Sequence, residues 1–432
     1  MTEPNRTTTG AELHGLAARL YPIPRSITGD GVRRTLDLLS EWVPLARVEV
    51  PSGTPVLDWT VPREWRLRAA YLVAPDGRRF ADVAVHNLHL LNYSAPFRGR
   101  LSLAELKPHL FSLPDRPELI PYRTSYYRET WGFCLPHREL EALPEGEYEV
   151  VVDTELFDGS LSYGELALAG DSEREMLLAT HTCHPSLAND NLSGLVVLAA
   201  LARELAARPR RRLSYRFLFA PGTIGAITWL AKNEAKTPKI AHGLVAAGLG
   251  DGGAFHYKRS RRGDAAIDRA VPHALAALGE PVEIEDFVPF GYDERQYNSP
   301  GFALPVGSLT RTPWGRYPEY HTSADDLDFI RPAQLERSLA VYRAVVDLLD
   351  GNATYRNRSP KGEPMLGRRG LYRPIGGDDG GRERELALLW VLNLSDGVHD
   401  LLAVAERSRL PFARVREAAD RLLEADLLVE VD

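Results

Sequence analysis

Cysteine is almost missing from this chain, which has only Cys134 and Cys183 among its 432 residues. Two thiols exclude a framework of several disulfides and a cysteine-rich metal site. Long apolar runs are also missing, and none approaches the length of a membrane-spanning helix, so no membrane partner is expected. Residues 1–6 lack the basic and apolar regions of a signal peptide, and we therefore expect a cytoplasmic location.

An excess of positive charge is missing as well. The chain has 52 Lys and Arg against 59 Asp and Glu, a formal net charge of −7 at pH 7. Such a charge gives no general attraction to nucleic acid, so no nucleic-acid partner is expected. The composition, 44% hydrophobic and 26% charged, is typical of a soluble globular protein long enough for two or three domains.

The most informative stretch runs from residue 176 to residue 205. An apolar segment ending at His181 predicts a buried strand, the following Asn-Asp-Asn predicts a loop, and the apolar run 195–205 predicts a helix. His181 and Asp190 then leave the chain at the carboxyl end of a strand, where open α/β sheets usually place their ligands. An imidazole nitrogen with a carboxylate oxygen suits zinc and tolerates manganese or cobalt.

These residues also have a simpler interpretation. Asn189 and Asp190 are typical helix N-caps, and a single histidine is more often buried without a metal. The rest of the chain favours a metal site, because Asp251 and His321 also follow predicted strands. One edge of a sheet can then gather all four metal-ligand candidates, namely His181, Asp190, Asp251 and His321.

The pattern of elements predicts an α/β fold with additional domains. Alternating strands and helices over residues 171–350 indicate a mostly parallel sheet flanked by helices, and residues 10–46 are expected to add N-terminal helices to it. Residues 47–170 predict an inserted small β-rich domain. Residues 351–381 are expected to be a linker, and residues 1–9 to be disordered.

Residues 382–432 read as three short helices and a terminal strand, a winged-helix pattern that often binds DNA. This segment holds seven basic and eleven acidic residues, whereas a DNA-binding domain needs a basic face. We therefore expect an interaction module, and the C-terminal or the inserted domain could support a homo-oligomer.

The order of these motifs resembles that of the co-catalytic zinc aminopeptidases. More closely, nearly the whole chain is similar to a poorly characterised aminopeptidase-like family with an inserted β domain and a C-terminal winged helix. The resemblance rests on Arg25-Ser-Ile-Thr-Gly, on Cys183-His-Pro-Ser-Leu-Ala-Asn-Asp-Asn-Leu-Ser-Gly and on Asp293-Glu-Arg-Gln. It implies that His181, Asp190 and Asp251 surround one metal ion, and that Asp190 and His321 serve a second.

This chain departs from the aminopeptidases at three positions. Cys183 stands where they have the aspartate of His-x-Asp, and Gly222 and Thr223 stand where they have a glutamate pair, one a general base and the other a metal ligand. Because an anionic ligand is lost, we expect one zinc ion rather than two. The missing base would contribute roughly 10²–10⁴-fold to the rate, although zinc itself polarises a carbonyl and activates water.

A replacement base is expected from Glu294 or Asp293 in the loop 291–296, or from His184 beside the first ligand. The two acids could instead be exposed loop charges. Cys183 is expected to pack behind the site rather than act as a nucleophile. The residues expected to bind substrate are Arg25, Arg259, Arg295 and Tyr320, although the basic loop around Arg259 could simply be solvated.

These observations together predict a zinc-dependent, aminopeptidase-like hydrolase. Its substrate is expected to be an amide of a small amino-acyl or peptide-like molecule, in a biosynthetic pathway rather than in bulk protein breakdown. The alternative is a catalytically weakened relative that binds an amino acid or peptide, or that scaffolds partners. A third interpretation is an enzyme that forms an amide rather than breaking one.

Overall fold

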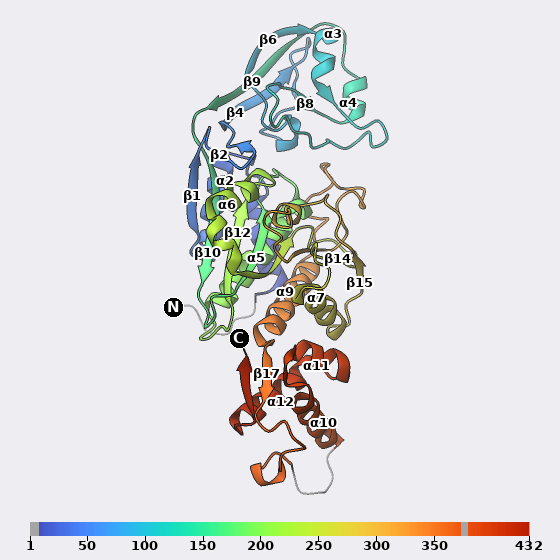
Figure 1. The fold of residues 1–432 in the computed structure, drawn as a ribbon. Helices are drawn as coiled ribbons and strands as arrows, with labels where there is room; N and C mark the ends of the chain where they lie inside the picture. The colour runs from blue at the N-terminus through green and yellow to red at the C-terminus, as the bar shows by residue number, and fades with distance from the viewer. Residues whose placement is uncertain (1–7, 373–378, 432) are drawn as a thin grey trace. The chain divides into compact units, whose positions relative to one another are not determined.

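The computed structural model describes residues 8–372 and 379–431. Residues 1–7 of the segment 1–9, which was expected to be disordered, therefore lie outside the described residues. The chain divides into two compact units (Figure 1). They comprise Met1–Asp268 with Pro281–Ala340, and Arg269–Glu280 with Val341–Asp432. Among the described helices, none combines the length and the apolar character needed to cross a bilayer.

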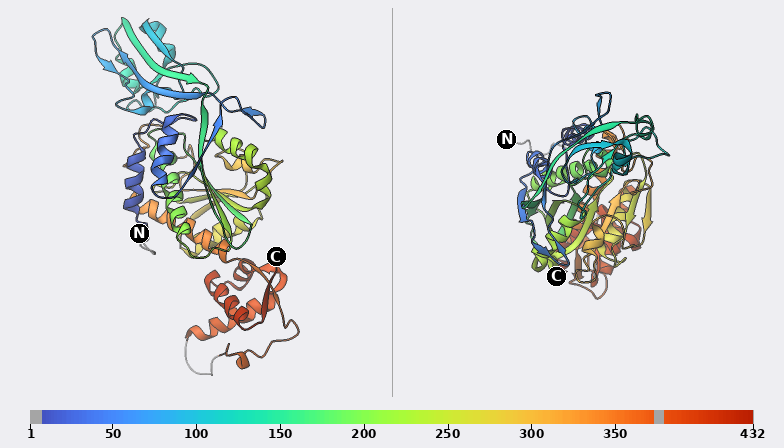
Figure 2. Two further views of the ribbon diagram at one scale, coloured as in Figure 1. Left: turned by 90° about the vertical axis from the view of Figure 1, so that its left-hand side faces the viewer. Right: turned by 90° about the horizontal axis from the view of Figure 1, so that it is seen from above.

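The first unit is built on an eight-stranded sheet with helices on both faces (Figures 1 and 2). Its strands lie in the order β1 (Ala46–Pro51), β10 (Ser160–Leu168), β12 (Ser214–Ala220), β11 (Glu175–His181), β13 (Ile240–Ala246), β16 (Val306–Thr310), β14 (Phe255–Lys258) and β15 (Val282–Glu285). The helices are α1 (Gly10–Leu20), α2 (Asp30–Ser40), α5 (Gly194–Ala206), α6 (Ile224–Asn233) and α8 (Glu294–Tyr297). Helices α7 (Ala266–Ala277) and α9 (Pro332–Gly351) run across the boundaries between the two ranges.

The four central strands, β12, β11, β13 and β16, run parallel. They are buried nearly throughout because helices cover both faces, which explains their continuous apolar sequence. Helix α5 follows β11 and buries ten of its thirteen residues. The expected α/β architecture is confirmed. Strand β11, which ends at His181, lies between β12 and β13 in the middle of the sheet.

The segment between β1 and β10 carries a second sheet of four antiparallel strands. Its order is β5 (Arg79–Phe80), β4 (Glu64–Val73), β9 (Glu147–Phe157) and β6 (Phe97–Ser102). Shorter elements accompany it: β2 (Pro55–Val56), β3 (Trp59–Thr60), β7 (Leu110–Phe111), β8 (Phe133–Cys134), α3 (Leu103–Leu106) and α4 (His137–Glu141).

The range 47–170, predicted as an inserted domain, therefore needs one correction. Strands β1 and β10 at its two ends belong to the large sheet, where β10 pairs antiparallel with both β1 and β12. Alternating apolar and polar residues show that a segment is a strand, but they do not show which sheet it joins.

In the second unit, helices α10 (Asp379–Leu394), α11 (Leu401–Ser408) and α12 (Phe412–Glu424) pack with a three-stranded sheet. Its strands lie in the order β18 (Asp396–Asp400), β17 (Thr354–Asn357) and β19 (Leu428–Val431). Strand β17 falls inside the range 351–381, which was predicted to be a linker. The four residues of β17 are too few for a clear period-two pattern, and only pairing with β18 and β19 defines the strand.

Candidate metal centre

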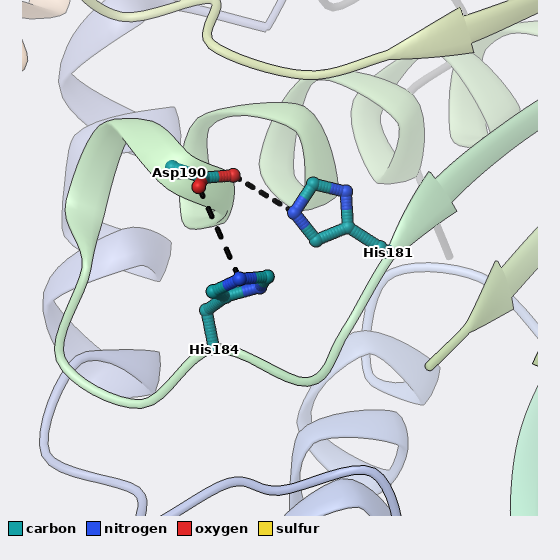
Figure 3. A group of neighbouring side chains, drawn as sticks. All are labelled: His181, His184 and Asp190. Carbon is teal, nitrogen blue, oxygen red and sulfur yellow. Dashed lines mark hydrogen bonds and ion pairs between the residues drawn. The ribbon is translucent and has the colours of Figure 1, made fainter. Parts of the chain in front are cut away.

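The candidate centre lies where β11 ends. His181 is the last residue of that strand, and the chain then loops to a short irregular helical segment, Ala188–Ser193, before α5 begins. Asp190 lies within this segment and points back to the strand end (Figure 3). The imidazole of His181 and the carboxylate of Asp190 therefore point toward each other in a buried position, with His181 5% and Asp190 1% exposed.

Three imidazoles surround the carboxylate of Asp190. His181 Nε2 lies 2.8 Å from Asp190 Oδ1, and His321 Nε2 lies 3.1 Å from Asp190 Oδ2. His184 Nε2 lies 4.0 Å from Asp190 Oδ2 on a different side (Figure 3). The ligand atoms of His181, His184 and Asp190 all lie within 4.8 Å of one another.

The electrostatics of the cluster keep its carboxylate ionised. Burial acts to raise the pKa of Asp190, but its interactions with the neighbouring histidines, among them the hydrogen bonds with His181 and His321, outweigh burial and hold the pKa well below its usual value. Burial lowers the pKa of His184 to about 3, so this imidazole is neutral at physiological pH. Burial also acts to lower the pKa of His181, but the hydrogen bond with Asp190 and its negative charge outweigh burial and raise that pKa. Metal binding requires neutral imidazole nitrogens, a form that His184 already has.

Two residues whose roles the sequence did not reveal hold this cluster in place. Asp325 Oδ1 and Oδ2 accept the backbone N–H groups of Asn189 and Asp190, at 2.5 and 2.9 Å. Asn191 Nδ2 lies 3.2 Å from His181 Nδ1 and donates to Thr180 Oγ1. The amide of Asn191 thus contacts the ring nitrogen that the aspartate of a His-x-Asp motif would orient.

The segment inserted between β1 and β10 also reaches the centre. The Tyr122 ring packs against the rings of His184 and His321, with centroids 5.1 and 5.0 Å apart. Its backbone N–H donates to His321 O at 2.8 Å. On the other side, the Tyr292 ring stacks on His181 with centroids 5.7 Å apart. Neither aromatic residue was predicted as a site residue, although Tyr292 directly precedes the Asp293-Glu-Arg-Gln motif.

Asp251 is not part of this cluster in the described structure. Its Oδ1 accepts from the Gly253 N–H and the Thr312 hydroxyl, and its Oδ2 accepts from Asn189 Nδ2 at 3.1 Å. Asn189 is the neighbour of Asp190, so Asp251 supports the loop that carries the ligand. Direct coordination by Asp251 would require these hydrogen bonds to rearrange, and it stays a prediction.

The two acidic base candidates occupy different environments. Glu294 is fully buried and forms an ion pair with Lys258, whose Nζ also donates to Phe290 O. Asp293 lies beside Gly222, and burial raises its pKa to about 6. His184, the third candidate, contacts the Cys183 thiol through Nδ1 at 3.4 Å. The Cys183 thiol is buried, and burial raises its pKa to about 12, which does not favour a nucleophilic thiolate.

The predicted substrate residues are dispersed. Arg25 is buried, donates to His184 O and Leu20 O, and leaves Nη2 without a hydrogen-bond partner. Tyr320 stacks on His321, with ring centroids 3.9 Å apart. Arg295 Nη2 lies 3.4 Å from Thr223 Oγ1. Arg259 instead pairs with the exposed Asp286, as a solvated basic loop would.

The donor set fits a zinc ion. Zinc in proteins is bound by imidazole nitrogens and carboxylate oxygens in a compact tetrahedral arrangement. The buried cluster offers nitrogen from His181, His184 and His321 around the oxygens of Asp190, and no thiolate is needed. At positions 222 and 223 the chain has no carboxylate for a second ion.

Comparison with known proteins supports the architecture. Residues 14–352 match a family described as "Domain of unknown function (DUF4910)", and residues 353–430 match a winged helix-turn-helix family. A Clostridium acetobutylicum protein, provisionally named a polysaccharide biosynthesis protein with aminopeptidase-like domain, is 47% identical over 424 residues, covering 98% of this chain and 97% of the relative.

Solved structures agree with these matches. The crystal structure of a provisionally assigned peptidase from Clostridium acetobutylicum is similar with a TM-score of 0.91 and 46% identity, covering 98% of this chain and 96% of that one. A zinc aminopeptidase from Bacillus subtilis is similar with a TM-score of 0.57 and 13% identity, over 80% of this chain and 95% of that one. At 13% identity the second likeness shows a shared fold.

Proposed function

This chain belongs to the DUF4910 family, and on that premise we propose that it is a zinc-dependent hydrolase of an amide bond in a small amino-acyl or peptide-like substrate. The observation that carries the proposal is the buried Asp190 carboxylate with three imidazoles facing it. Such a concentration of metal-ligand groups is costly to bury without a metal, because the carboxylate must otherwise be compensated by the histidines alone.

We assign His181, Asp190 and His321 as the primary ligands of one zinc ion, with His184 as a third nitrogen close by. When bound, zinc polarises the carbonyl of the scissile amide and lowers the pKa of water. The residues of the chain do the rest. Asp325 and Asn191 hold the ligands in register, and the rings of Tyr122 and Tyr292 enclose the cluster and restrict water.

The names of the relatives support a biosynthetic setting. One is associated by name with polysaccharide biosynthesis and one with peptidase activity. A hydrolase that trims an aminoacyl or acylamino group from a biosynthetic precursor is consistent with both. The competing function is a pseudo-peptidase that binds an amino acid or peptide, which is favoured by the loss of the glutamate at position 222.

The two functions differ in turnover. We would measure zinc content by mass spectrometry and hydrolysis of a panel of L-aminoacyl p-nitroanilides for the native chain, His181→Ala and His399→Ala. His399 is a suitable control because it lies outside the cluster, near the surface of the second unit. The hydrolase predicts one zinc per chain and turnover, with both lost only in His181→Ala. Zinc without turnover on any amide would favour the pseudo-peptidase.

A further inference from the structure

Gly222 leaves a space at the centre that another residue fills. A Cβ atom at position 222 would lie 3.1 Å from the Cβ of His181, and 3.3 and 3.4 Å from Oδ1 and Oδ2 of Asp293. That separation is the reach of a glutamate carboxylate from its own Cβ. The resemblance to the aminopeptidases implies a glutamate carboxylate at this position, and here the carboxylate of Asp293, from a different segment, lies in the same region.

The neighbouring acid does not compete for this place. Glu294 forms an ion pair with Lys258, and a Cβ at Gly291 would contact both of these groups. The negative charge of Glu294 is therefore balanced by Lys258 and not by a group at position 222. The carboxylate of Asp293, in contrast, makes no hydrogen bond or ion pair with the residues that the structure describes, and Asp293 keeps 6% of its surface exposed.

The surroundings hold Asp293 beside the ligand histidine. It directly precedes α8, whose first turn includes Arg295, and Arg295 Nη2 lies 3.4 Å from the hydroxyl of Thr223, the residue after Gly222. On the opposite side, the Cys183 thiol lies 3.5 Å from the Gly222 carbonyl oxygen. The segments 222–223, 183 and 293–295 therefore meet around one small space next to His181.

We propose that Asp293 is the proton acceptor of the hydrolytic reaction, a carboxylate relocated from position 222 to the start of α8. The proposal rests on the hydrolase function given above. Asp293 takes one proton from the attacking water as the water oxygen bonds to the carbonyl carbon. It returns that proton to the amine nitrogen as the C–N bond breaks, so that amide and water give acid and amine. Gly222 suits this arrangement, because a Cβ there would approach Asp293 Oδ1 to 3.3 Å and crowd this carboxylate.

The test compares Asp293→Asn with the native chain on the best p-nitroanilide of the panel. Asparagine keeps the shape and removes the proton acceptor, so kcat should fall roughly 10²–10⁴-fold while zinc content and KM stay unchanged. Asp286→Asn is the matched control, since its side chain is 86% exposed and forms an ion pair with Arg259. Retention of most of kcat in Asp293→Asn, or loss of zinc, would overturn the proposal.

Two further variants test the shared space itself. Gly222→Glu with Asp293 in place should give no gain in kcat, because the position is already taken; a gain of about tenfold or more would contradict the relocation. Gly222→Ala should lower Tm in the native chain and lower it less in an Asp293→Ala background. Additive shifts in Tm would show that the two positions do not share space. The Tm comparison can be interpreted even if no amide is hydrolysed. A failure to hydrolyse any amide would contradict the proposed function and not the shared space.

Discussion

Asp325 is the residue on which the geometry of the candidate ligand Asp190 most depends. Its two carboxylate oxygens accept the N–H groups of Asn189 and Asp190, and all three residues are at least 99% buried. Removing the carboxylate leaves two buried donors without partners, each costing about 1–3 kcal/mol. We expect Asp325→Ala to lower the free energy of unfolding by about 2–5 kcal/mol and to weaken zinc binding.

Urea unfolding and calorimetric zinc titration measure both effects. Asp328→Ala is the control, because Asp328 is an exposed residue three positions along the same loop, and it should change stability by no more than about 0.5 kcal/mol. Equal zinc affinity for Asp325→Ala and the native chain would show that Asp325 does not position the ligand loop.

At this scale the sequence pointed to candidate ligands but not to the residues around them. His181, Asp190 and His321 follow strands or sit in tight motifs, and the structure brings their side chains together. Asp251 also follows a strand, but strand ends fix where a residue lies and not where its side chain points. The supporting roles of Asn191 and Asp325 depend on single hydrogen bonds across the fold, which no spacing in the sequence reveals.

Among the helices and strands, the start of α5 is where close packing most directly affects the candidate metal centre. A Cβ at Gly194 would lie 2.4 Å from Asn191 Oδ1 and 2.7 Å from both the Ala246 carbonyl oxygen and Thr180 Oγ1. Such crowding forces Asn191 away from His181. We expect Gly194→Ala to cost about 1–3 kcal/mol of stability and to reduce zinc affinity.

Gly15→Ala provides the matched control for this helix prediction. Gly15 lies inside α1, and no atom is within 4 Å of the Cβ that alanine would add. Alanine should therefore stabilise the chain by about 0.5–1 kcal/mol through helix propensity, with zinc affinity unchanged. The prediction for α5 fails if both alanine variants are equally stable.

Element boundaries show where sequence patterns stop being informative. The buried strands and α5 were recognisable because their apolar runs are long and continuous. Strands β1 and β10 could be seen as strands, yet their membership of the large sheet depends on pairing between segments more than a hundred residues apart. Strand β17 was missed because its four residues gain meaning only from β18 and β19.

For the molecule as a whole, the winged-helix part is the region where fold and charge disagree. The residues from 382 onward include seven basic and eleven acidic side chains. Neutralising phosphates requires clustered Lys and Arg, so this net negative charge opposes DNA binding despite the fold. We expect no change in the fluorescence anisotropy of a labelled DNA duplex on adding the full chain at low salt. Saturable binding that weakens as salt is raised would contradict this expectation.

The central claim is that residues from separate segments of the first unit, His181, Asp190 and His321, hold one zinc ion. The most direct measurement is the anomalous difference density, at the zinc absorption edge, of crystals of the full chain grown with zinc. We predict one peak per chain, about 2.0–2.2 Å from His181 Nε2 and from a carboxylate oxygen of Asp190. Zinc density at other residues only, with none between His181 and Asp190, would contradict the account.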